Sequence, residues 1–432
     1  MRKVLLLATT AVVGAGMLIG TASAQMQTAP EVVAPRAMGS TAAGVNIRLG
    51  GFFNFQGAWI NDSADKQAVA LSGGRRAGRR QHNFIQETEI YVFADGKTAS
   101  GMTYGFEVQF QIDGLQNQAG AGLGNGTGFN TDEAFGYIAG TWGTFKFGDE
   151  DSAASLLQVR RPGITGLDSD SYWDEQLVNG SPSIFTGIND GSDATKITYL
   201  SPQFFGFDFG VSYAPSSTEG DRAAQSAYNS GARDRSTIQD EVSVGARFRT
   251  SIAGVGIAAG VGAQTAGAPQ TTTTGVANFQ QVTAYTAGLT ATAYGFTVGG
   301  EYTWGQYTGV SVGRAALGTG RRNSEHLVGS LAYVVPGVGL QVGGFYGRGT
   351  QDINGTNVGG LAGGARAVGG PEFRQSVWGV GLAYPLAPGL VAFTSYTKVN
   401  EKNSPYPLTA GQPRFSTGRE IDIALAGLRL AF

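Results

Sequence analysis

The sequence contains no cysteine, so no disulfide bond stabilises the fold of these 432 residues. Only 14% of the residues are charged, which is low for a soluble enzyme but typical of a β-sheet with one face in lipid. The formal net charge of −2 argues against a nucleic-acid partner, because such partners require basic clusters. Histidine is almost absent. His82 and His326 neighbour no nucleophile, so we expect neither an enzyme nor a bound cofactor.

After the first twenty-odd residues the sequence has no long apolar run. A membrane-spanning helix would need roughly 20 apolar residues in succession. The first 24 residues have a basic start, an apolar stretch at 4–19 and small residues at 22–24. This order is typical of a secretory signal peptide, with cleavage after residue 24. Residues 25–44 show no periodicity, and we expect a flexible N-terminal extension there.

From residue 45 onward, apolar and polar side chains alternate. In one segment Phe207, Phe209 and Val211 alternate with Asp208 and Ser212. Side chains on a β-strand point to opposite faces in turn, so one face suits hydrocarbon and the other suits water. A soluble β-sandwich alternates in the same way, so the connections between segments must distinguish the two folds. The same pattern recurs in residues 45–56, 104–112 and 296–304.

The connections are alternately short and long. The short ones are residues 95–100, 141–143, 201–206, 251–254, 294–295, 336–337 and 385–389. The long ones are residues 61–79, 113–130, 149–193, 216–240, 266–278, 306–324, 350–372 and 401–418. This order is expected of an all-β, up-and-down antiparallel transmembrane barrel with periplasmic turns and outer loops. We predict about 16 strands in residues 45–432, enough to enclose an aqueous channel.

The longest connection, residues 149–193, is acidic and contains the pair Arg160-Arg161. Connections of this length are uncommon unless they are functional. We predict that this third long loop folds into the barrel and narrows the lumen. Tyr172 and Trp173 are the side chains expected to hold the loop against the wall.

The final segment, residues 420–432, ends on Phe432. Its alternation directs Arg429 inward, but Ile421, Ile423 and Leu425 then fall on the face toward water. Because every backbone group in hydrocarbon must be paired, this strand must meet the first one and close the barrel. We expect the three apolar side chains to be buried under a loop.

Three stretches and the terminal phenylalanine resemble the Gram-negative porin family, particularly its alphaproteobacterial members. The stretches are residues 87–108 (ETEIYVFADGKTASGMTYGFEV), 143–152 (GTFKFGDEDS) and 197–202 (ITYLSP). The resemblance covers residues 45–432. It implies a 16-stranded barrel in the outer membrane, a homotrimer, and passive diffusion of small hydrophilic solutes and ions. It also implies contact with outer-membrane lipid and lipopolysaccharide, and recognition of Phe432 by the outer-membrane assembly machinery.

In this family, acidic groups on the third loop face basic groups on the wall, and pore width and lining charge set selectivity. The residues of this sequence that match the acidic side are Glu150, Asp151, Asp168, Asp170, Asp174 and Glu175. The inward basic candidates are Arg48, Lys146, Arg247 and Arg249, of which Arg247 and Arg249 lie near a short turn. The alternative for each acidic residue is a solvated loop position.

Other functions are left open by the sequence. Asp168 and Asp170 are also a weak candidate for a Ca²⁺ site, although a full set of ligands is missing. A channel selective for a sugar or an organic anion is the alternative to a general diffusion pore. A structural or adhesive barrel with a plugged lumen is a third hypothesis.

Overall fold

The computed structural model describes residues 36–40, 44–63, 69–70, 76–77, 80–113, 129–167, 172–177, 188, 194–216, 237–272, 275–276, 279–307, 316, 319, 321–352, 372–403 and 418–432. Sixteen of the strands in this part of the chain close into one antiparallel barrel. They are β2 (Asn46–Asp62), β5 (His82–Lys97), β6 (Thr103–Asp113), β7 (Phe129–Gly140), β8 (Gly143–Asp149), β9 (Thr195–Leu200), β10 (Phe207–Ser216), β11 (Gln239–Ile252), β12 (Val255–Gly267), β15 (Val282–Ala293), β16 (Phe296–Gln306), β17 (Ser324–Val334), β18 (Gln341–Gln351), β19 (Phe373–Ala387), β20 (Leu390–Lys402) and β21 (Arg419–Ala431).

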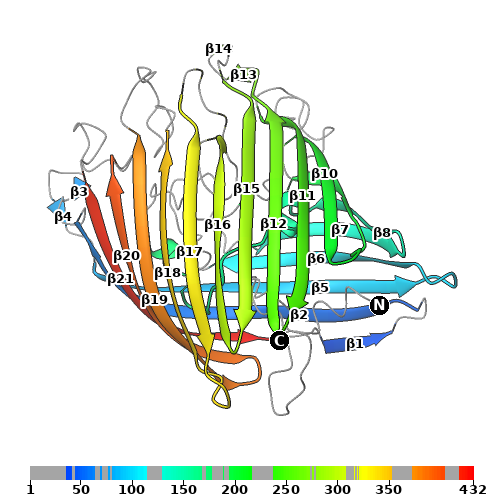
Figure 1. Cartoon of the computed structure of the whole chain (residues 1–432), viewed down its shortest axis with the longest axis horizontal. Coiled ribbons are helices and arrows are strands. Elements are labelled where there is room, and N and C mark those ends of the chain that lie inside the picture. Colours follow the sequence, from blue (N-terminus) through cyan, green and yellow to red (C-terminus); the bar gives the residue numbers. More distant parts are fainter. Residues whose placement is uncertain are drawn as a thin grey trace.

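Each strand pairs with its neighbours in the chain, so the topology is the predicted up-and-down one. In Figure 1 strands β12, β15 and β16 run vertically, and β2, β5 and β6 cross them at a steep angle. Such crossing is expected where two walls of a barrel with tilted strands are seen through one another. The prediction of a closed all-β barrel is confirmed.

The barrel closes between β2 and β21, whose register runs from Phe52 opposite Ala431 to Asp62 opposite Ile421. At the short-turn end the backbones of Gly51 and Phe432 exchange hydrogen bonds of 3.1 and 3.0 Å. Closure leaves no row of unpaired backbone groups in the membrane, which is the requirement for a spanning sheet.

A buried ion network joins the last two strands to the first at the loop end of this seam. The Arg419 guanidinium donates from Nε to Asp62 at 3.0 Å and from Nη1 to Glu401 at 3.4 Å. All three side chains are almost completely buried. The network links β2, β20 and β21 on the inward face.

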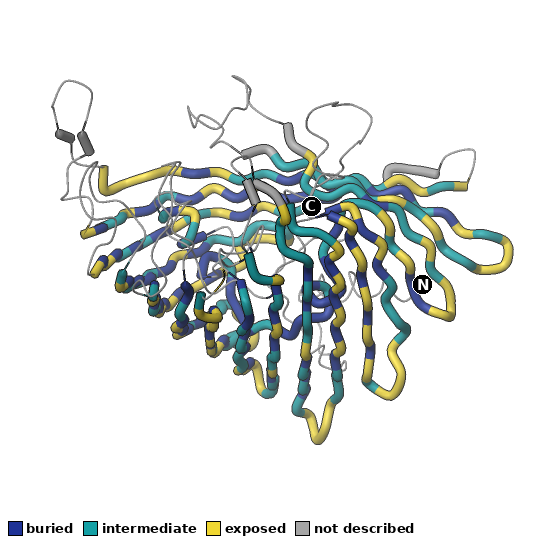
Figure 2. The backbone as a smooth tube through the Cα atoms, turned by 90° about the horizontal axis from the view of Figure 1, so that it is seen from above, coloured by how far each residue is buried: buried dark blue, intermediate teal, exposed yellow. Residues whose placement is uncertain are grey.

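Buried and exposed residues alternate along each strand, as Figure 2 shows. On β10, Phe207 and Phe209 are 58% and 50% exposed, whereas Asp208 and Ser212 are buried. The exposed face is therefore apolar and the opposite, inward face is largely polar, as expected of a barrel with lipid outside and water inside.

Several short turns are tight two-residue hairpins. Ala253-Gly254 and Tyr294-Gly295 connect their strands with positive φ at both residues, 51° and 82° in the first and 52° and 82° in the second. Type I′ turns require this conformation, and they match the twist of the flanking strands.

One expectation from the sequence is corrected here. Residues 36–40 were expected to be part of a flexible extension, but Arg36–Ser40 forms β1, which pairs antiparallel with β2 from Leu49 to Asn46. The free edge of β2 beyond the end of β21 explains this pairing, because β21 begins its own contacts with β2 only at Phe52. The expected signal peptide lies outside the described residues.

Small elements complete the described part. They are the hairpins β3 (Val69–Ala70) with β4 (Arg76–Ala77) and β13 (Thr271–Thr272) with β14 (Gly275–Val276), the helix α2 (Ala153–Leu156) and the 3₁₀ helix η2 (Asp174–Gln176). Neither helix in the described ranges has the length and apolar character needed to cross a membrane.

Candidate functional site

The candidate site is the barrel interior, which holds residues 150–167 and 172–177, here called the inner segment. These residues follow β8 and contact inward-facing side chains of β10, β11, β12 and β15 to β20 in turn. The segment therefore lies along the inside of the wall over much of its circumference.

Helix α2 attaches the start of the inner segment to β10 and β11. Its N-cap is Ser152, and the backbone N–H groups of Ala153 and Ala154 donate to the hydroxyls of Ser212 and Ser243 at 3.0 and 2.9 Å. The first N–H groups of a helix have no partner within the helix. Here the wall supplies the acceptors, so the helix end is fixed without a longer cap.

Glycines on the wall make room for the middle of the inner segment. A Cβ at Gly288 on β15 would overlap the carbonyl oxygen of Val159, and one at Gly260 on β12 would lie 2.8 Å from its side chain. A Cβ at Gly299 on β16 would approach Pro162 to 3.1 Å. Backbone can approach a strand this closely only where the strand has no side chain, so these positions determine the path of the segment.

Two wall serines bind carbonyl groups further along. Ser330 on β17 donates to the carbonyl of Pro162, and Ser395 on β20 donates to the carbonyl of Gly166 at 2.6 Å. These bonds pair carbonyl groups that burial would otherwise leave without a partner. The segment is therefore bonded to the wall at its helix and again at two carbonyls.

Aromatic contacts anchor the second half of the inner segment. Trp173 is fully buried and stacks on Phe345, with ring centroids 6.2 Å apart and an interplanar angle of 23°. Tyr172 packs edge-on against Phe393 at 5.3 Å, and the Arg161 guanidinium lies 4.6 Å from the Phe345 ring centroid. Tyr172 and Trp173 are thus the wall contacts that the sequence suggested.

The inward apolar residues of β21 pack against this same segment. Ile421, Ile423 and Leu425 are buried in one cluster with Ile164 and Trp173. An apolar side chain on the inward face is stabilised when another apolar surface covers it. The interruption of alternation in the last strand therefore marks where the inner segment lies.

The predicted acidic residues occupy different surroundings. Glu150 is buried and pairs with Lys146, and the Asp151 carboxylate accepts from the Ser155 hydroxyl at 3.3 Å. Asp174 accepts from the backbone N–H of Tyr172 at 3.3 Å, whereas Glu175 is exposed. Asp168 and Asp170 lie outside the described residues.

Burial determines the titration of the two acids at the start of the segment. It raises the pKa of the Glu150 carboxyl, against the opposing effect of the neighbouring Lys146. It also raises the pKa of the Asp151 carboxyl, against the opposing effect of Arg160. Both groups therefore take up protons at a higher pH than solvated carboxylates.

The predicted basic residues are all paired with carboxylates. Lys146 lies on β8 beside Glu150, and its Nζ is 3.9 Å from the Phe135 ring centroid. The neighbours of Lys146, Phe145 and Phe147, face outward as expected, at 39% and 49% exposed. Lys146 is the one candidate that bonds directly to an acid of the inner segment.

The other three basic candidates lie near the short turns. Arg48 binds Asp95 on β5, with Nε 2.8 Å from the carboxylate. Arg247 and Arg249 share Asp208, through contacts of 2.6 and 3.0 Å to the same oxygen. These ion pairs join adjacent strands of the wall near its turn end.

Lys196 is an inward cation that the sequence reasoning missed. It is 3% exposed on β9, and its Nζ donates to the backbone carbonyl of Glu150. The signal was present, because Ile197 and Tyr199 alternate with it and Ile197 is 60% exposed on the outer face. Lys146 and Lys196 together hold the start of the inner segment from two strands.

A short row of polar side chains continues this charged region along the wall. The Gln109 amide donates to Glu107 at 3.2 Å and to Glu133 at 2.7 Å. The acidic side chains of this region therefore come from β6, β7 and the inner segment. They lie among the basic side chains of β8 and β9.

The described residues contain no group of three or more His, Cys, Asp or Glu side chains arranged to hold a metal ion. The weak Ca²⁺ candidate, Asp168 with Asp170, falls outside this part of the chain.

Comparison with known proteins identifies the fold. A family described as Gram-negative porin matches residues 8–404. No curated protein sequence matches the chain. Among solved structures, the chain is similar to an anion-selective porin from Comamonas acidovorans, with a TM-score of 0.54 and 13% identity over 90% of this chain and 100% of that one.

Two further solved structures have the same fold. A loop L8 deletion mutant of OmpT, an outer membrane protein of Vibrio cholerae, aligns with a TM-score of 0.53 and 12% identity over 90% of this chain and 100% of that one. A porin refined at 1.8 Å resolution aligns with a TM-score of 0.52 and 14% identity over 89% of this chain and 100% of that one.

Proposed function

Because the chain belongs to the Gram-negative porin family, we propose that its outer-membrane channel is narrowed by the inner segment and that charges around Glu150 tune the passage of solutes. Porins are channel proteins, and this one allows small hydrophilic solutes to diffuse passively across the outer membrane. The interior of the barrel, rather than a catalytic centre, is the functional site.

The observation that supports the constriction most strongly is the set of contacts between the inner segment and the inward face. A segment attached by Ser212, Ser243 and Ser395, and packed through Trp173, occupies cross-section that water would otherwise fill. The space left for solutes is bordered by strands that the inner segment does not cover, such as β6 and β7, which carry Glu107, Gln109 and Glu133. Pore width and lining charge are the two determinants of selectivity in such channels.

Planar-bilayer recording of the purified protein tests the channel. We expect ohmic steps that scale with bulk salt conductivity, because a water-filled pore has no saturable ion site. A purified, inserted protein that passes no current would instead support a barrel with a plugged, structural role.

Liposome swelling separates a general pore from a substrate-selective one. In a general pore the rate of swelling falls smoothly with solute size for neutral sugars and organic anions alike. Saturable flux of one sugar or one anion, with competition by its analogues, would favour the selective alternative. The anion-selective porin of Comamonas acidovorans shares the fold at 13% identity, so its selectivity sets no expectation here.

We propose a homotrimer, supported by the short strands β8 and β9, which form a low wall on one side of the barrel. Strand β8 has 7 residues and β9 has 6, fewer than the roughly 9–11 that a tilted strand needs to cross a bilayer. Their outward side chains Phe145, Phe147 and Ile197 are nonetheless apolar and exposed. Neighbouring protomers would cover this low wall.

The remaining partners follow from the outer-membrane location. We propose export through the signal peptide in residues 1–24, recognition of Phe432 by the assembly machinery, and contact with lipopolysaccharide in the outer leaflet. The Phe432 side chain is 46% exposed while its backbone pairs with Gly51. Phe432→Ala should therefore leave the seam intact but reduce the yield of heat-modifiable barrel in the membrane; an unchanged yield would contradict the role.

A further inference from the structure

Two arginines and one aspartate form a charged cluster on the inward face of β10 and β11. The Arg247 guanidinium donates to the Asp208 carboxylate from Nε at 3.2 Å and from Nη2 at 2.6 Å, so this ion pair is bidentate. Arg249 donates from Nη2 to the same carboxylate at 3.0 Å. Two cations therefore share one anion, and the cluster carries a net positive charge.

The cluster lies on the turn side of the inner segment. A Cβ at Gly245 on β11 would lie 2.8 Å from the carbonyl oxygen of Ala153, so the segment covers the strand at that position. Arg247 and Arg249 are the next two inward residues of β11 toward the turn. The strand rise places Arg249 about 13 Å beyond Gly245. A solute that leaves the proposed constriction toward the turn end therefore enters the part of the lumen that these two side chains line.

The strands around the cluster supply no second carboxylate. On the turn side of the inner segment, the described residues of β9 to β12 include one acid, which is Asp208. Beside the arginines, β12 presents Gly260 opposite Arg247 and Ala258 opposite Arg249. Neither of these small residues has a charged or hydrogen-bonding side chain. The excess positive charge of the cluster is therefore not balanced by the wall.

Arg249 has an unsatisfied donor. Its Nε is buried and has no hydrogen-bond partner, while its side chain as a whole is 17% exposed. A buried donor without an acceptor costs free energy, and the cost is larger for a charged group. A carboxylate or phosphate group from the lumen would supply the acceptor through charge-assisted hydrogen bonds, which are stronger than neutral ones. Its negative charge would also offset the repulsion between the two guanidinium groups.

We propose that Arg247 and Arg249 form a subsite for the oxyanion group, a carboxylate or a phosphate, of a solute that passes through the lumen. This inference rests on the proposed channel and gives it a solute class. Arg249 is the main contact, because Asp208 already binds Arg247 at two donors. The planar guanidinium suits both oxyanions and stays charged at every physiological pH.

Titration of the purified protein in detergent with inorganic phosphate, followed by the line width of the phosphorus NMR signal, tests the subsite without a current measurement. Low ionic strength is used because salt screens the charges. For R249Q we expect the dissociation constant to rise at least about tenfold, since the lost charge-assisted bonds are worth a factor of this order. R249Q leaves the bidentate Arg247–Asp208 pair in place, and heat-modifiable migration like that of the wild type shows that the barrel has folded.

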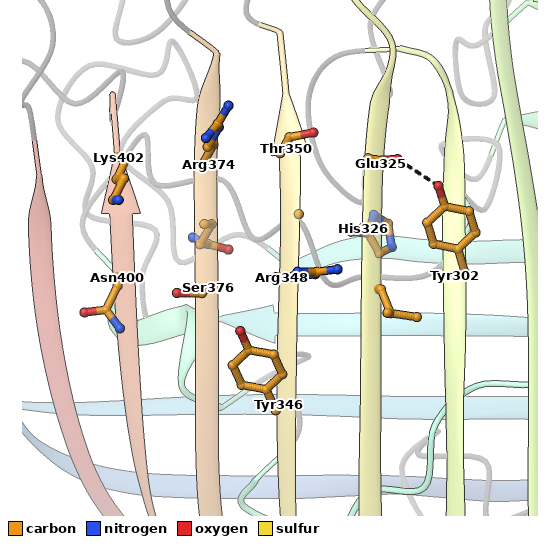
Figure 3. Close-up of a pocket in the computed structure, with 13 residues that line it drawn as sticks. Tyr302, Glu325, His326, Tyr346, Arg348, Thr350, Arg374, Ser376, Asn400 and Lys402 are labelled. Carbon is orange, nitrogen blue, oxygen red and sulfur yellow. Dashed lines mark hydrogen bonds between the residues drawn. The ribbon is translucent and has the colours of Figure 1, made fainter.

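D208N gives a test of the opposite sign. It removes the shared carboxylate and keeps both arginines, so phosphate should bind about fourfold more tightly, as expected for one unit charge about 5 Å away in water. The matched control is R374Q, which removes an arginine from the outward face of β19, outside the lumen (Figure 3). This control should leave the dissociation constant within about twofold.

Succinate, followed by its proton NMR signal, distinguishes the two oxyanions. Tighter binding of phosphate assigns the subsite to phosphorylated solutes, tighter binding of succinate assigns it to carboxylates, and equal binding means that it accepts either. Unchanged binding of both ligands by R249Q would overturn the proposal, as would weaker binding by a folded D208N. An R374Q variant that loses as much affinity as R249Q would also reject it, because the effect would then be one of net charge.

Failure of the subsite and failure of the channel give different results. A wild type that binds phosphate or succinate but passes no current would contradict the proposed channel and leave the subsite standing. A wild type that conducts but binds neither oxyanion would reject the subsite alone.

Discussion

Lys146 in the middle of β8 forms an ion pair with Glu150, four residues later, where the chain leaves the wall and enters the interior. The charge of the wall and the charge of the inner segment are therefore in direct contact, and together they are close to neutral. Removing either partner leaves one unbalanced charge beside the proposed constriction.

Single neutralisations of this pair should change ion selectivity in opposite directions. K146Q leaves the carboxylate unpaired and should favour cations, whereas E150Q leaves the ammonium and should favour anions. A unit charge about 5 Å from a passing ion contributes about 0.8 kcal/mol in water, which is a factor of about four in local concentration. Reversal potentials in a salt gradient measure the change, with K402Q on the outward face of β20 as the control. Shifts of the same sign for both variants would contradict this arrangement.

Selectivity should also depend on pH at values above those of ordinary carboxylates. Burial raises the pKa of both Glu150 and Asp151. As pH falls, protonation removes their negative charge, so the permeability ratio should shift toward anions. The shift should begin above about pH 4, where solvated carboxylates titrate. Reversal potentials between pH 8 and pH 4 test this, and E150Q/D151N should lose that part of the response. A midpoint at or below that of a free carboxylate would show that the two groups are solvated.

Substitution of Gly288 should narrow the channel further. In G288A the new methyl group would overlap the carbonyl oxygen of Val159, so the inner segment must move away from β15. Displacement away from the wall carries the segment further into the lumen, so we expect a smaller single-channel conductance from a barrel that still assembles. The matched control is G329A on β17, where a Cβ would meet its nearest atom at 3.7 Å, an ordinary contact. Equal conductance in G288A and G329A would mean that the segment does not limit the pore.

The low wall of β8 and β9 should carry the contacts between protomers. F147S/I197S removes two exposed apolar side chains there and should lower the temperature at which the trimer dissociates on a semi-native gel. V261S/L289S removes two side chains of similar exposure, 58% and 56%, from the tall wall formed by β12 and β15. That control should leave the trimer intact, since its positions face lipid. An equal effect of both double variants would place the interface elsewhere.

The architecture was predictable because its signals are local. Alternation with a period of two identifies each strand and its outward face, and the length of each connection identifies the end of the barrel to which it belongs. The inward direction of Arg429 and the outward direction of Phe145 and Phe147 followed from the same counting. Even the buried Ile421 and Ile423, which broke the pattern, correctly indicated that a loop covers them.

The path of the inner segment required the tertiary structure. Nothing in the order of residues connects Val159 with Gly288, or Ser395 with the carbonyl of Gly166, because these contacts join positions more than a hundred residues apart. The pairing of β1 with β2 was likewise missed, since five residues without alternation have no strand signal of their own.

The sequence by itself therefore determined a lipid-facing barrel, its strands and the position of its long acidic loop, because strand period and turn chemistry act between near neighbours. Only the tertiary structure decided which charges meet. It paired Lys146 with Glu150 and held Lys196 against the same loop. Those relations depend on strand register and barrel closure, which residues distant along the chain determine together.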